Sequence, residues 1–384
     1  MHASFLLALL PFALAAPVIT PRNTQVIPGK YIVKLKTSAS DANLDEALAL
    51  LPTAPEHKYK FGGFNGFAGK ISDAAVKKLQ ALDAIEYIQK DAQVHTMDFL
   101  SESGAPWGLG RISHTVKGNS TYLYDSTAGE GTCSYVIDTG IFVDHLEFEG
   151  RATWLANFAE DGDDTDGAGH GTHVAGTIGS KTYGVAKKTK LFAVKVLDAS
   201  GSGSYAGVIA GINFAAQDMA TRTANGECAK GSVANMSLGG GKNTAVNQAV
   251  ANAVGAGLFF AIAAGNSNDD AEFYSPASEL TACTIGASDS DDKRASFSNF
   301  GALVDVFAPG VNILSTWNDG KTNSISGTSM ATPHIAGLGA YLLALEGSGT
   351  AQLCERIVEL AGKGLLTGIP SGTVNAIAFN GASA

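Results

Sequence analysis

The sequence predicts an α/β fold, a three-layer sandwich around a mostly parallel sheet, preceded by a small α+β unit. Short and continuously apolar runs at 133–137, 191–197 and 258–263 are typical of strands buried on both faces of a parallel sheet. Helical stretches lie between these runs, and this alternation predicts a parallel sheet covered by helices. Near residue 100 the sequence pattern changes to short apolar runs that alternate with helical stretches, and this change separates the sandwich from the smaller unit.

Residues 1–15 are typical of a signal peptide, because an apolar run from Phe5 to Leu14 is followed by an A-x-A cleavage signal at Ala13 and Ala15. The run is too short to span a bilayer, and no later run of about 20 apolar residues follows. A buried N-terminal helix is the alternative. We expect a secreted, extracellular protein without a membrane segment.

The segment 16–99 should form the smaller unit. The expected elements are a strand at 31–36, a helix at 41–51, a strand pair at 61–71, a helix at 72–82 and a strand at 85–94. Ser72 is placed to cap the second helix. This strand–helix–strand–strand–helix–strand order predicts a ferredoxin-like α+β fold.

The segment 100–384 should form the sandwich. Its expected helices cover 171–178, 205–219, 243–256 and 328–345. Active sites of such folds gather at the carboxyl ends of the parallel strands. Polar residues that directly follow the apolar runs are therefore the first candidates for function.

Composition narrows the range of functions. The formal net charge of −10 disfavours nucleic acid as a partner, because phosphate binding needs a basic surface. A secreted chain with four cysteines is expected to contain disulfides. Cysteine spacing alone leaves all three possible pairings open.

Asp138 and His170 are the first two catalytic candidates. Asp138 ends an apolar run and precedes a glycine turn, although an aspartate there is more often a turn former. His170 lies between two glycines where a helix begins. A metal site shared with His173 is one alternative, but the glutamate of the zinc-protease motif is missing. A structural histidine is the other.

Ser329 and Asn266 complete the set. A serine at a helix start is usually an N-cap. Here Gly327 precedes it closely, and Pro333 is expected at the start of the helix, where a missing N–H is tolerated. Free N–H groups at that end would stabilise an oxyanion. Asn266 follows an apolar run and is either a turn residue or an amide donor to the oxyanion.

Together these four residues supply what catalysis by a serine nucleophile requires. Serine reacts poorly until a base removes its proton. An imidazole base in turn needs an acid that orients it and stabilises its charged form.

Three segments, 138–140, 170–173 and 327–331, resemble the signature motifs of subtilisin-like serine proteases. Two more, 182–189 and 297–301, resemble the proteinase K branch of secreted fungal enzymes. The resemblance extends from about residue 105 to residue 375 and implies a serine endopeptidase.

The resemblance also implies the roles of the four candidates. Ser329 would attack the peptide carbonyl, and His170 would act as general base and then as general acid. Asp138 would orient His170. Asn266 and the backbone N–H of Ser329 would form the oxyanion hole.

The resemblance further implies that an extended substrate pairs with two backbone segments, 201–203 and 237–239. The residues expected at the primary pocket are not acidic, which disfavours a kexin-like convertase specific for basic residues. We expect broad specificity with a preference for large hydrophobic or aromatic P1 residues. Tyr205 would form a wall of the distal pocket. The expected substrate-binding residues are Gly201, Ser202, Gly203, Tyr205, Ser237, Leu238, Gly239, Ala263, Ala264 and Gly265.

The resemblance divides the chain into a signal peptide at 1–15, an inhibitory and chaperone propeptide at 16–99, and a subtilisin-like peptidase domain at 100–384. We expect a zymogen that processes itself near Phe99–Leu100 and is inhibited by its own propeptide. The other expected partners are protein and peptide substrates, and we expect a monomer.

Disulfides and calcium also follow from the resemblance. The disulfides that it implies are Cys133–Cys228 and Cys283–Cys354. The ligands of the structural Ca²⁺ site that it implies are the Asp305 carboxylate and the carbonyls of Leu280 and Ala282. A second Ca²⁺ site would pair the Thr115 carbonyl with an acid at the position that Leu365 holds. Leucine offers no oxygen ligand, so we expect that site to be missing.

The acidic run 160–166 is expected to be a solvated loop, because Thr172 stands where an EF-hand loop needs its glutamate. Asn119 begins a glycosylation sequon in an expected surface loop. Asn235 also begins a sequon, but we expect it to stay unmodified beside the substrate cleft.

Three other functions remain as alternatives. A catalytically silent binding protein could share this fold, because fold does not guarantee function. An inhibitor or adhesion protein would use only the N-terminal unit. A different hydrolase chemistry is the third alternative. The complete set of four catalytic candidates favours the serine endopeptidase.

Overall fold

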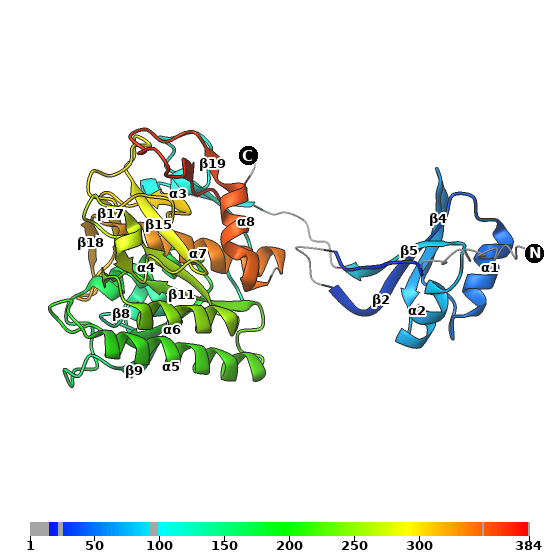
Figure 1. Ribbon diagram of the computed structural model, residues 1–384, viewed down its shortest axis with the longest axis horizontal. Helices are drawn as coiled ribbons and strands as arrows, with labels where there is room; N and C mark the ends of the chain where they lie inside the picture. Colours follow the sequence, from blue (N-terminus) through cyan, green and yellow to red (C-terminus); the bar gives the residue numbers. More distant parts are fainter. Residues whose placement is uncertain (1–14, 22–25, 93–98, 348, 383–384) are drawn as a thin grey trace, which may run out of the picture. The chain divides into compact units, whose positions relative to one another are not determined.

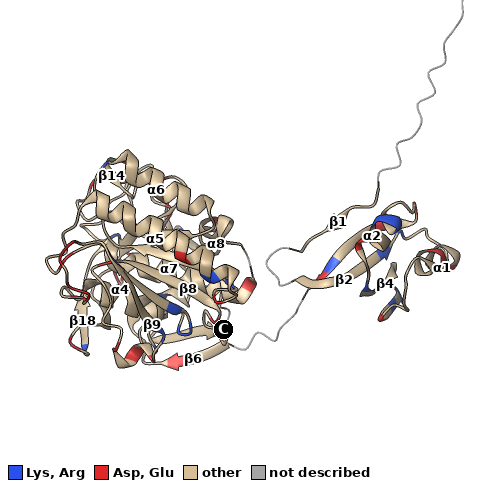
Figure 2. Ribbon diagram, turned by 90° about the horizontal axis from the view of Figure 1, so that it is seen from below, with Lys and Arg blue, Asp and Glu red and all other residues tan. Residues whose placement is uncertain are grey.

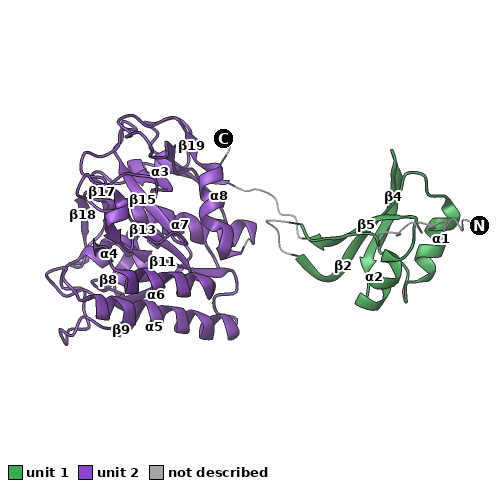
Figure 3. Ribbon diagram, in the orientation of Figure 1, with its two compact units in different colours: residues 1–96 green, residues 97–384 purple. Residues whose placement is uncertain are grey.

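The computed structural model describes residues 15–21, 26–92, 99–347 and 349–382. The chain divides into two compact units, unit 1 at 1–96 and unit 2 at 97–384, which Figure 3 shows in different colours. The expected signal peptide, apart from Ala15, lies outside the described residues. The expected boundary after Phe99 lies within unit 2, three residues beyond the division between the units.

Unit 1 is a sheet covered by two helices. Its elements are β1 (Val18–Ile19), β2 (Val26–Leu35), α1 (Asp41–Ala49), β3 (His57–Phe61), β4 (Phe64–Lys70), α2 (Asp73–Gln80) and β5 (Ile85–Ala92). The strand order is β1-β5-β2-β4-β3, and all neighbours except β1 and β5 are antiparallel. Ser72 caps α2 by accepting from the Ala75 N–H. The ferredoxin-like prediction is confirmed.

Unit 2 is built on a nine-stranded sheet. In sheet order its strands are β19 (Gly362–Lys363), β20 (Ala376–Ile377), β16 (Val306–Pro309), β15 (Cys283–Ser288), β13 (Phe259–Ala263), β11 (Gly231–Met236), β8 (Thr132–Asp138), β10 (Lys190–Lys195) and β9 (Ala152–Asn157). All neighbouring pairs are parallel except β19 with β20 at the edge. The central strands are buried throughout, as their apolar runs predict.

Helices cover both faces of this sheet (Figure 1). The helices α4 (His170–Gly179) and α7 (Thr328–Glu346) share one hydrophobic core with one face of the sheet. The helices α5 (Tyr205–Ala224) and α6 (Thr244–Gly255) share a second core with the other face. The predicted three-layer sandwich is confirmed. Within it α7 is buried along almost its whole length, because its residues are small or apolar on every side.

Smaller elements complete unit 2. They are β6 (Phe99–Ser103), α3 (Trp107–Ile112), β7 (Thr121–Asp125), η1 (Leu146–Phe148), β12 (Gly240–Gly241), η2 (Ala271–Phe273), β14 (Tyr274–Ser275), β17 (Ile313–Thr316), β18 (Thr322–Ile325), η3 (Thr350–Gln352) and α8 (Leu353–Leu360). Disulfides join Cys133 to Cys228 and Cys283 to Cys354, the two bonds that the resemblance implies.

The fold brings the catalytic candidates to one edge of the sheet. Strands β13, β11 and β8 are direct neighbours and run parallel. Asp138 is the last residue of β8, Ser237 follows β11, and Asn266 follows β13. All three therefore lie at the carboxyl edge, where ligand sites of such sheets form.

Residues of both signs of charge are distributed along the described chain. In the view of Figure 2, Lys and Arg are scattered among acidic residues, in keeping with the net charge of −10. Among the residues that the structure describes, no helix is both long and apolar enough to cross a bilayer.

Candidate active site

Asp138 and His170 form a direct pair. His170 is the first residue of α4, and its Nδ1 lies 2.7 Å from Oδ1 of Asp138. Asp138 is completely buried, whereas the His170 side chain is 28% exposed. Burial lowers the His170 pKa, but the charge and hydrogen bond of Asp138 outweigh it and raise the pKa above the ordinary value. The pair is therefore a base whose protonated form is stabilised by a buried acid.

Ser329 is the second residue of α7, and Gly327 holds the cap position, so Ser329 is not an N-cap. Its hydroxyl donates to the Ser237 carbonyl at 3.2 Å. Among the described residues no hydrogen bond joins Ser329 to His170, although α4 and α7 pack against each other. Catalytic hydrogen bonds often tighten only when substrate binds.

Pro333 lies beyond the first turn of α7, not at its start as expected. A residue with an N–H at this position would donate to the Ser329 carbonyl four residues earlier. Because proline has no N–H, that carbonyl is left free. The Ser237 hydroxyl donates to it instead at 2.8 Å.

Two N–H donors converge beside Gly327. The Asn266 side-chain oxygen accepts from the Thr328 N–H at 2.8 Å and from the Thr328 hydroxyl at 2.9 Å, so its amide nitrogen is left to donate elsewhere. That nitrogen and the Ser329 backbone nitrogen each lie 3.6 Å from the point that a Cβ on Gly327 would occupy. A Cβ on residue 327 would therefore contact both donors, in space that an oxyanion could occupy.

His173 does not form a metal site with His170. Its Nε2 lies 2.9 Å from the Ile313 carbonyl, and the ring is fully buried. Burial lowers the His173 pKa to about 4, so the ring is neutral. His173 is a structural histidine, as one of the two alternatives predicts.

A groove of about 800 Å³ runs past His170. Tyr205 forms part of its wall, where the phenol hydroxyl donates to the Gly241 carbonyl at 2.7 Å. Seven of the expected substrate-binding residues line the groove, namely Gly201, Ser202, Gly203, Tyr205, Ser237, Leu238 and Gly239.

A smaller pocket of about 220 Å³ adjoins Ser329 and Asn266. It contains the other three expected residues, Ala263, Ala264 and Gly265, and it shares Leu238 and Gly239 with the groove. No Asp, Glu, Lys or Arg lines it. The pocket therefore offers no charge to select a basic or acidic side chain.

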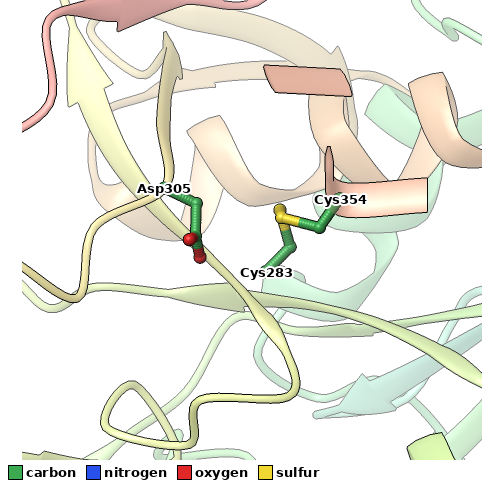
Figure 4. Close-up of side chains that lie close together, drawn as sticks. All are labelled: Cys283, Asp305 and Cys354. Carbon is green, nitrogen blue, oxygen red and sulfur yellow. A yellow bond between two sulfur atoms is a disulfide. The ribbon is translucent and has the colours of Figure 1, made fainter. Parts of the chain in front are cut away.

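Asp305 lies next to the disulfide of Cys283 and Cys354 (Figure 4). The bonded sulfurs are not available as thiolate ligands. Oδ2 of Asp305 accepts from the Thr284 N–H at 2.8 Å, and burial raises the pKa of the carboxyl to about 6. Asp305 is half-buried and has no cationic partner among the residues that the structure describes. Such a carboxylate is a donor that fits a hard cation such as Ca²⁺.

The two sequons differ in burial. Asn119 is partly exposed, and its side-chain oxygen accepts from the Thr121 N–H. Asn235 is fully buried in β11. A glycosyltransferase therefore cannot reach Asn235 in the folded protein.

The expectation of a solvated loop at 160–166 is wrong for Asp166. This residue is only 4% exposed, and its carboxylate accepts four hydrogen bonds. Sequence pattern alone could not separate it from its exposed acidic neighbours. Its place four residues before His170 was the one available signal.

Asn299 is a second residue that the sequence did not single out for function. Its side chain donates to the Ala264 carbonyl and accepts from the N–H groups of Ser267 and Asp269. It therefore shapes the turn that carries Asn266. The segment 297–301 served only to carry the resemblance.

Comparisons with known proteins identify the family of the chain. Residues 129–362 match the family described as "Subtilase family", and residues 30–97 match "Peptidase inhibitor I9". A cuticle-degrading protease of Metarhizium anisopliae is 54% identical over 394 residues, which cover all of both chains. Proteinase R of Parengyodontium album is 48% identical over 392 residues and 99% of each chain.

A solved structure is similar as well. A cold-adapted subtilisin-like serine proteinase gives a TM-score of 0.68 at 44% identity, covering 73% of this chain and 100% of its own. Fold, site and relatives together define a serine endopeptidase. The chain belongs to the subtilase family, in its proteinase K branch, and carries an I9 inhibitor domain before the protease domain.

Proposed function

We propose that this chain is a secreted zymogen whose unit 2 hydrolyses proteins through an acyl-enzyme on Ser329. One observation carries the proposal above all. The buried Asp138 bonds His170 at 2.7 Å, at the same sheet edge where the Asn266 amide and the Ser329 N–H flank Gly327.

The proposed reaction has two stages, acylation of Ser329 and then hydrolysis of the acyl-enzyme, and His170 transfers protons in both. His170 Nε2 takes the hydroxyl proton of Ser329 while the oxygen attacks the peptide carbonyl. Asp138 holds the Nδ1–H and stabilises the imidazolium. The Asn266 amide and the Ser329 N–H stabilise the oxyanion. His170 then protonates the amine as the peptide C–N bond breaks. Water attacks the acyl-enzyme with His170 as base, the ester bond to Ser329 breaks, and His170 returns the proton to the Ser329 oxygen.

Specificity is proposed to be broad, with a preference for large apolar or aromatic P1 side chains. The uncharged pocket beside Ser329 supports this preference. Main-chain pairing along Gly201–Gly203 and Ser237–Gly239 would hold substrates of many sequences. The comparison that tests it is kcat/KM for peptides that differ only in phenylalanine, lysine or glutamate at P1.

Zymogen control is proposed to rest on unit 1, whose match to an inhibitor family supports it. We propose that self-processing occurs near Phe99–Leu100, at the start of β6. We also propose that residues 1–15 direct secretion as a signal peptide. We further propose a monomer, glycosylation at Asn119, and one Ca²⁺ held by Asp305 with the carbonyls of Leu280 and Ala282.

The test of the catalytic assignment compares Ser329→Ala with Ser326→Ala, an exposed serine three residues away. Casein hydrolysis should vanish in the first variant and persist in the second, and a sulfonyl fluoride should label Ser329. N-terminal sequencing should find unprocessed chain only in Ser329→Ala. Hydrolysis by Ser329→Ala, or labelling at another residue, would refute the assignment.

A further inference from the structure

Asp166 is a buried carboxylate at the centre of a hydrogen-bond network. Its Oδ1 accepts from the Thr139 hydroxyl at 2.7 Å and from the Gly169 N–H at 2.8 Å. Its Oδ2 accepts from the N–H and the hydroxyl of Thr172 at 2.8 and 2.6 Å. A buried charge needs such a full set of partners, since an unpaired one is very costly.

This network reaches Asp138 through Thr139. The Thr139 N–H donates to Oδ1 of Asp138, the atom that also bonds His170. The Thr139 hydroxyl, while it donates to Asp166, accepts from the Gly171 N–H at 2.9 Å. One threonine therefore connects the end of β8 to the first turn of α4.

The same carboxylate reaches His170 through the start of its helix. Gly169, the cap residue of α4, has no side chain to accept from the free N–H groups of the first turn. Asp166 accepts from the Thr172 N–H, the third residue of the helix, as a capping side chain does. His170 lies between the two contacts, so Asp166 fixes the backbone on both sides of the imidazole.

The charge of Asp166 acts on the imidazole as well. In the described part of the chain, the titratable groups that face His170 or its immediate support are Asp138 on β8, Asp166 before α4, His173 within α4, and Lys195 at the end of β10. Lys195 also pairs with Asp161 at 3.0 Å. His173 is neutral. Lys195 donates to the Thr139 carbonyl. After Asp138, Asp166 is the second anion that raises the His170 pKa.

We propose that Asp166 is a positioning residue of the Asp138–His170 pair, which fixes the two side chains relative to each other and stabilises the imidazolium through its charge. The proposal rests on the proposed catalytic function. Asp166 is buried and does not line the groove beside His170, so its effect passes through Thr139 and through the first turn of α4.

The first test is Asp166→Asn, with Asp164→Asn as the matched control. Asp164 belongs to the same loop but is exposed, and among the described residues its carboxylate accepts from the Asn157 amide alone. An asparagine at 166 removes the charge, and its NH₂ cannot accept from the Thr172 N–H. We expect kcat to fall about tenfold to a hundredfold with little change in KM. The control should keep wild-type kcat.

A pH profile separates positioning from a structural role. Loss of the Asp166 charge should move the acid limb of kcat/KM to lower pH, because less negative charge then favours the protonated imidazole. Wild-type kcat with an unmoved limb in Asp166→Asn would overturn the proposal. A fall in kcat with an unmoved limb would overturn its electrostatic half.

Thr139→Val is a milder variant that remains informative if Asp166→Asn does not fold. It removes one hydroxyl and leaves the Asp166 charge in place, so kcat should fall without a shift of the acid limb. Thr139→Ser keeps the hydroxyl and should restore activity. Equal kcat in the valine and serine variants would contradict the link through Thr139.

The proposed function has its own point of failure. If wild-type enzyme is not labelled at Ser329 by a sulfonyl fluoride, the catalytic assignment fails. If Ser329 is labelled but Asp166→Asn behaves like Asp164→Asn, only the role of Asp166 fails.

Discussion

Ser237 and Ser329 exchange two hydrogen bonds. The Ser329 hydroxyl donates to the Ser237 carbonyl at 3.2 Å, and the Ser237 hydroxyl donates to the Ser329 carbonyl at 2.8 Å. The second bond is available because Pro333 leaves that carbonyl without a donor from its own helix. The groove segment that contains Ser237 is thus bonded to both the hydroxyl and the backbone carbonyl of Ser329, the proposed nucleophile.

Ser237→Ala should destabilise the enzyme, because it leaves the Ser329 carbonyl without its donor. The expected loss is about 1–3 kcal/mol in the free energy of unfolding. Pro333→Ala in the same chain should recover part of the loss, since residue 333 then offers an N–H to that carbonyl. Denaturant titration of sulfonyl-fluoride-blocked enzyme measures both, and strictly additive effects would contradict this pairing.

The pH dependence of activity should reflect the raised pKa of His170. The imidazole must be neutral to accept the serine proton, so kcat/KM should rise with pH at a midpoint above the ordinary value of 6.5. Asp138→Asn should lower kcat by about ten-thousandfold, the size seen in other serine triads. A midpoint at or below 6.5 for the wild-type enzyme would contradict the effect of Asp138.

Gly327→Ala should damage turnover more than stability. Its φ of 163° is extended backbone that alanine also adopts. The new Cβ would lie 3.6 Å from both the Asn266 amide nitrogen and the Ser329 nitrogen, in the proposed oxyanion space. We expect a lower kcat at nearly unchanged melting temperature. An unchanged kcat would contradict the assignment of the oxyanion hole to the space between the Asn266 amide and the Ser329 N–H.

Arg111 and Asp292 form a buried ion pair whose loss should be costly. The two side chains are 2% and 10% exposed, and the guanidinium donates to both carboxylate oxygens. Asp292 has φ 58°, which asparagine tolerates. Asp292→Asn should therefore cost about 3–5 kcal/mol through the unpaired arginine.

The neighbouring pair of Lys117 and Asp291 provides the control. It lies 3.8 Å apart and is largely exposed. Asp291→Asn should cost no more than about 1 kcal/mol. Equal losses of unfolding free energy in the two variants would show that burial does not set the difference.

Calcium removal should destabilise the wild-type enzyme if Asp305 holds the ion. Chelation should lower the melting temperature of blocked enzyme, and added Ca²⁺ should restore it, because a ligand of the folded state stabilises that state. Asp305→Asn should abolish this response. An Asp305→Asn variant that responds as strongly as wild type would place the ion elsewhere.

Much of the fold could be predicted because its signals are local. The apolar runs that become β8, β10 and β13 are continuous, since each strand is buried on both faces. The four catalytic candidates stand in short motifs at strand ends and helix starts, where chain direction alone brings them to one edge. The disulfide pairing needed the resemblance, because spacing left three choices.

By itself the sequence determined which residues could do the chemistry and which elements would carry them. Only the tertiary structure decided how those residues are held. Asp166 is one acid in an acidic run until the fold places Thr139, Gly169 and Thr172 around it. Pro333 leaves the Ser329 carbonyl without a helical donor, and the Ser237 hydroxyl can replace that donor only because β11 brings Ser237 close to Ser329. The physical reason is that a polar group takes the partners that distant segments bring to it, and local periodicity carries no information about those partners.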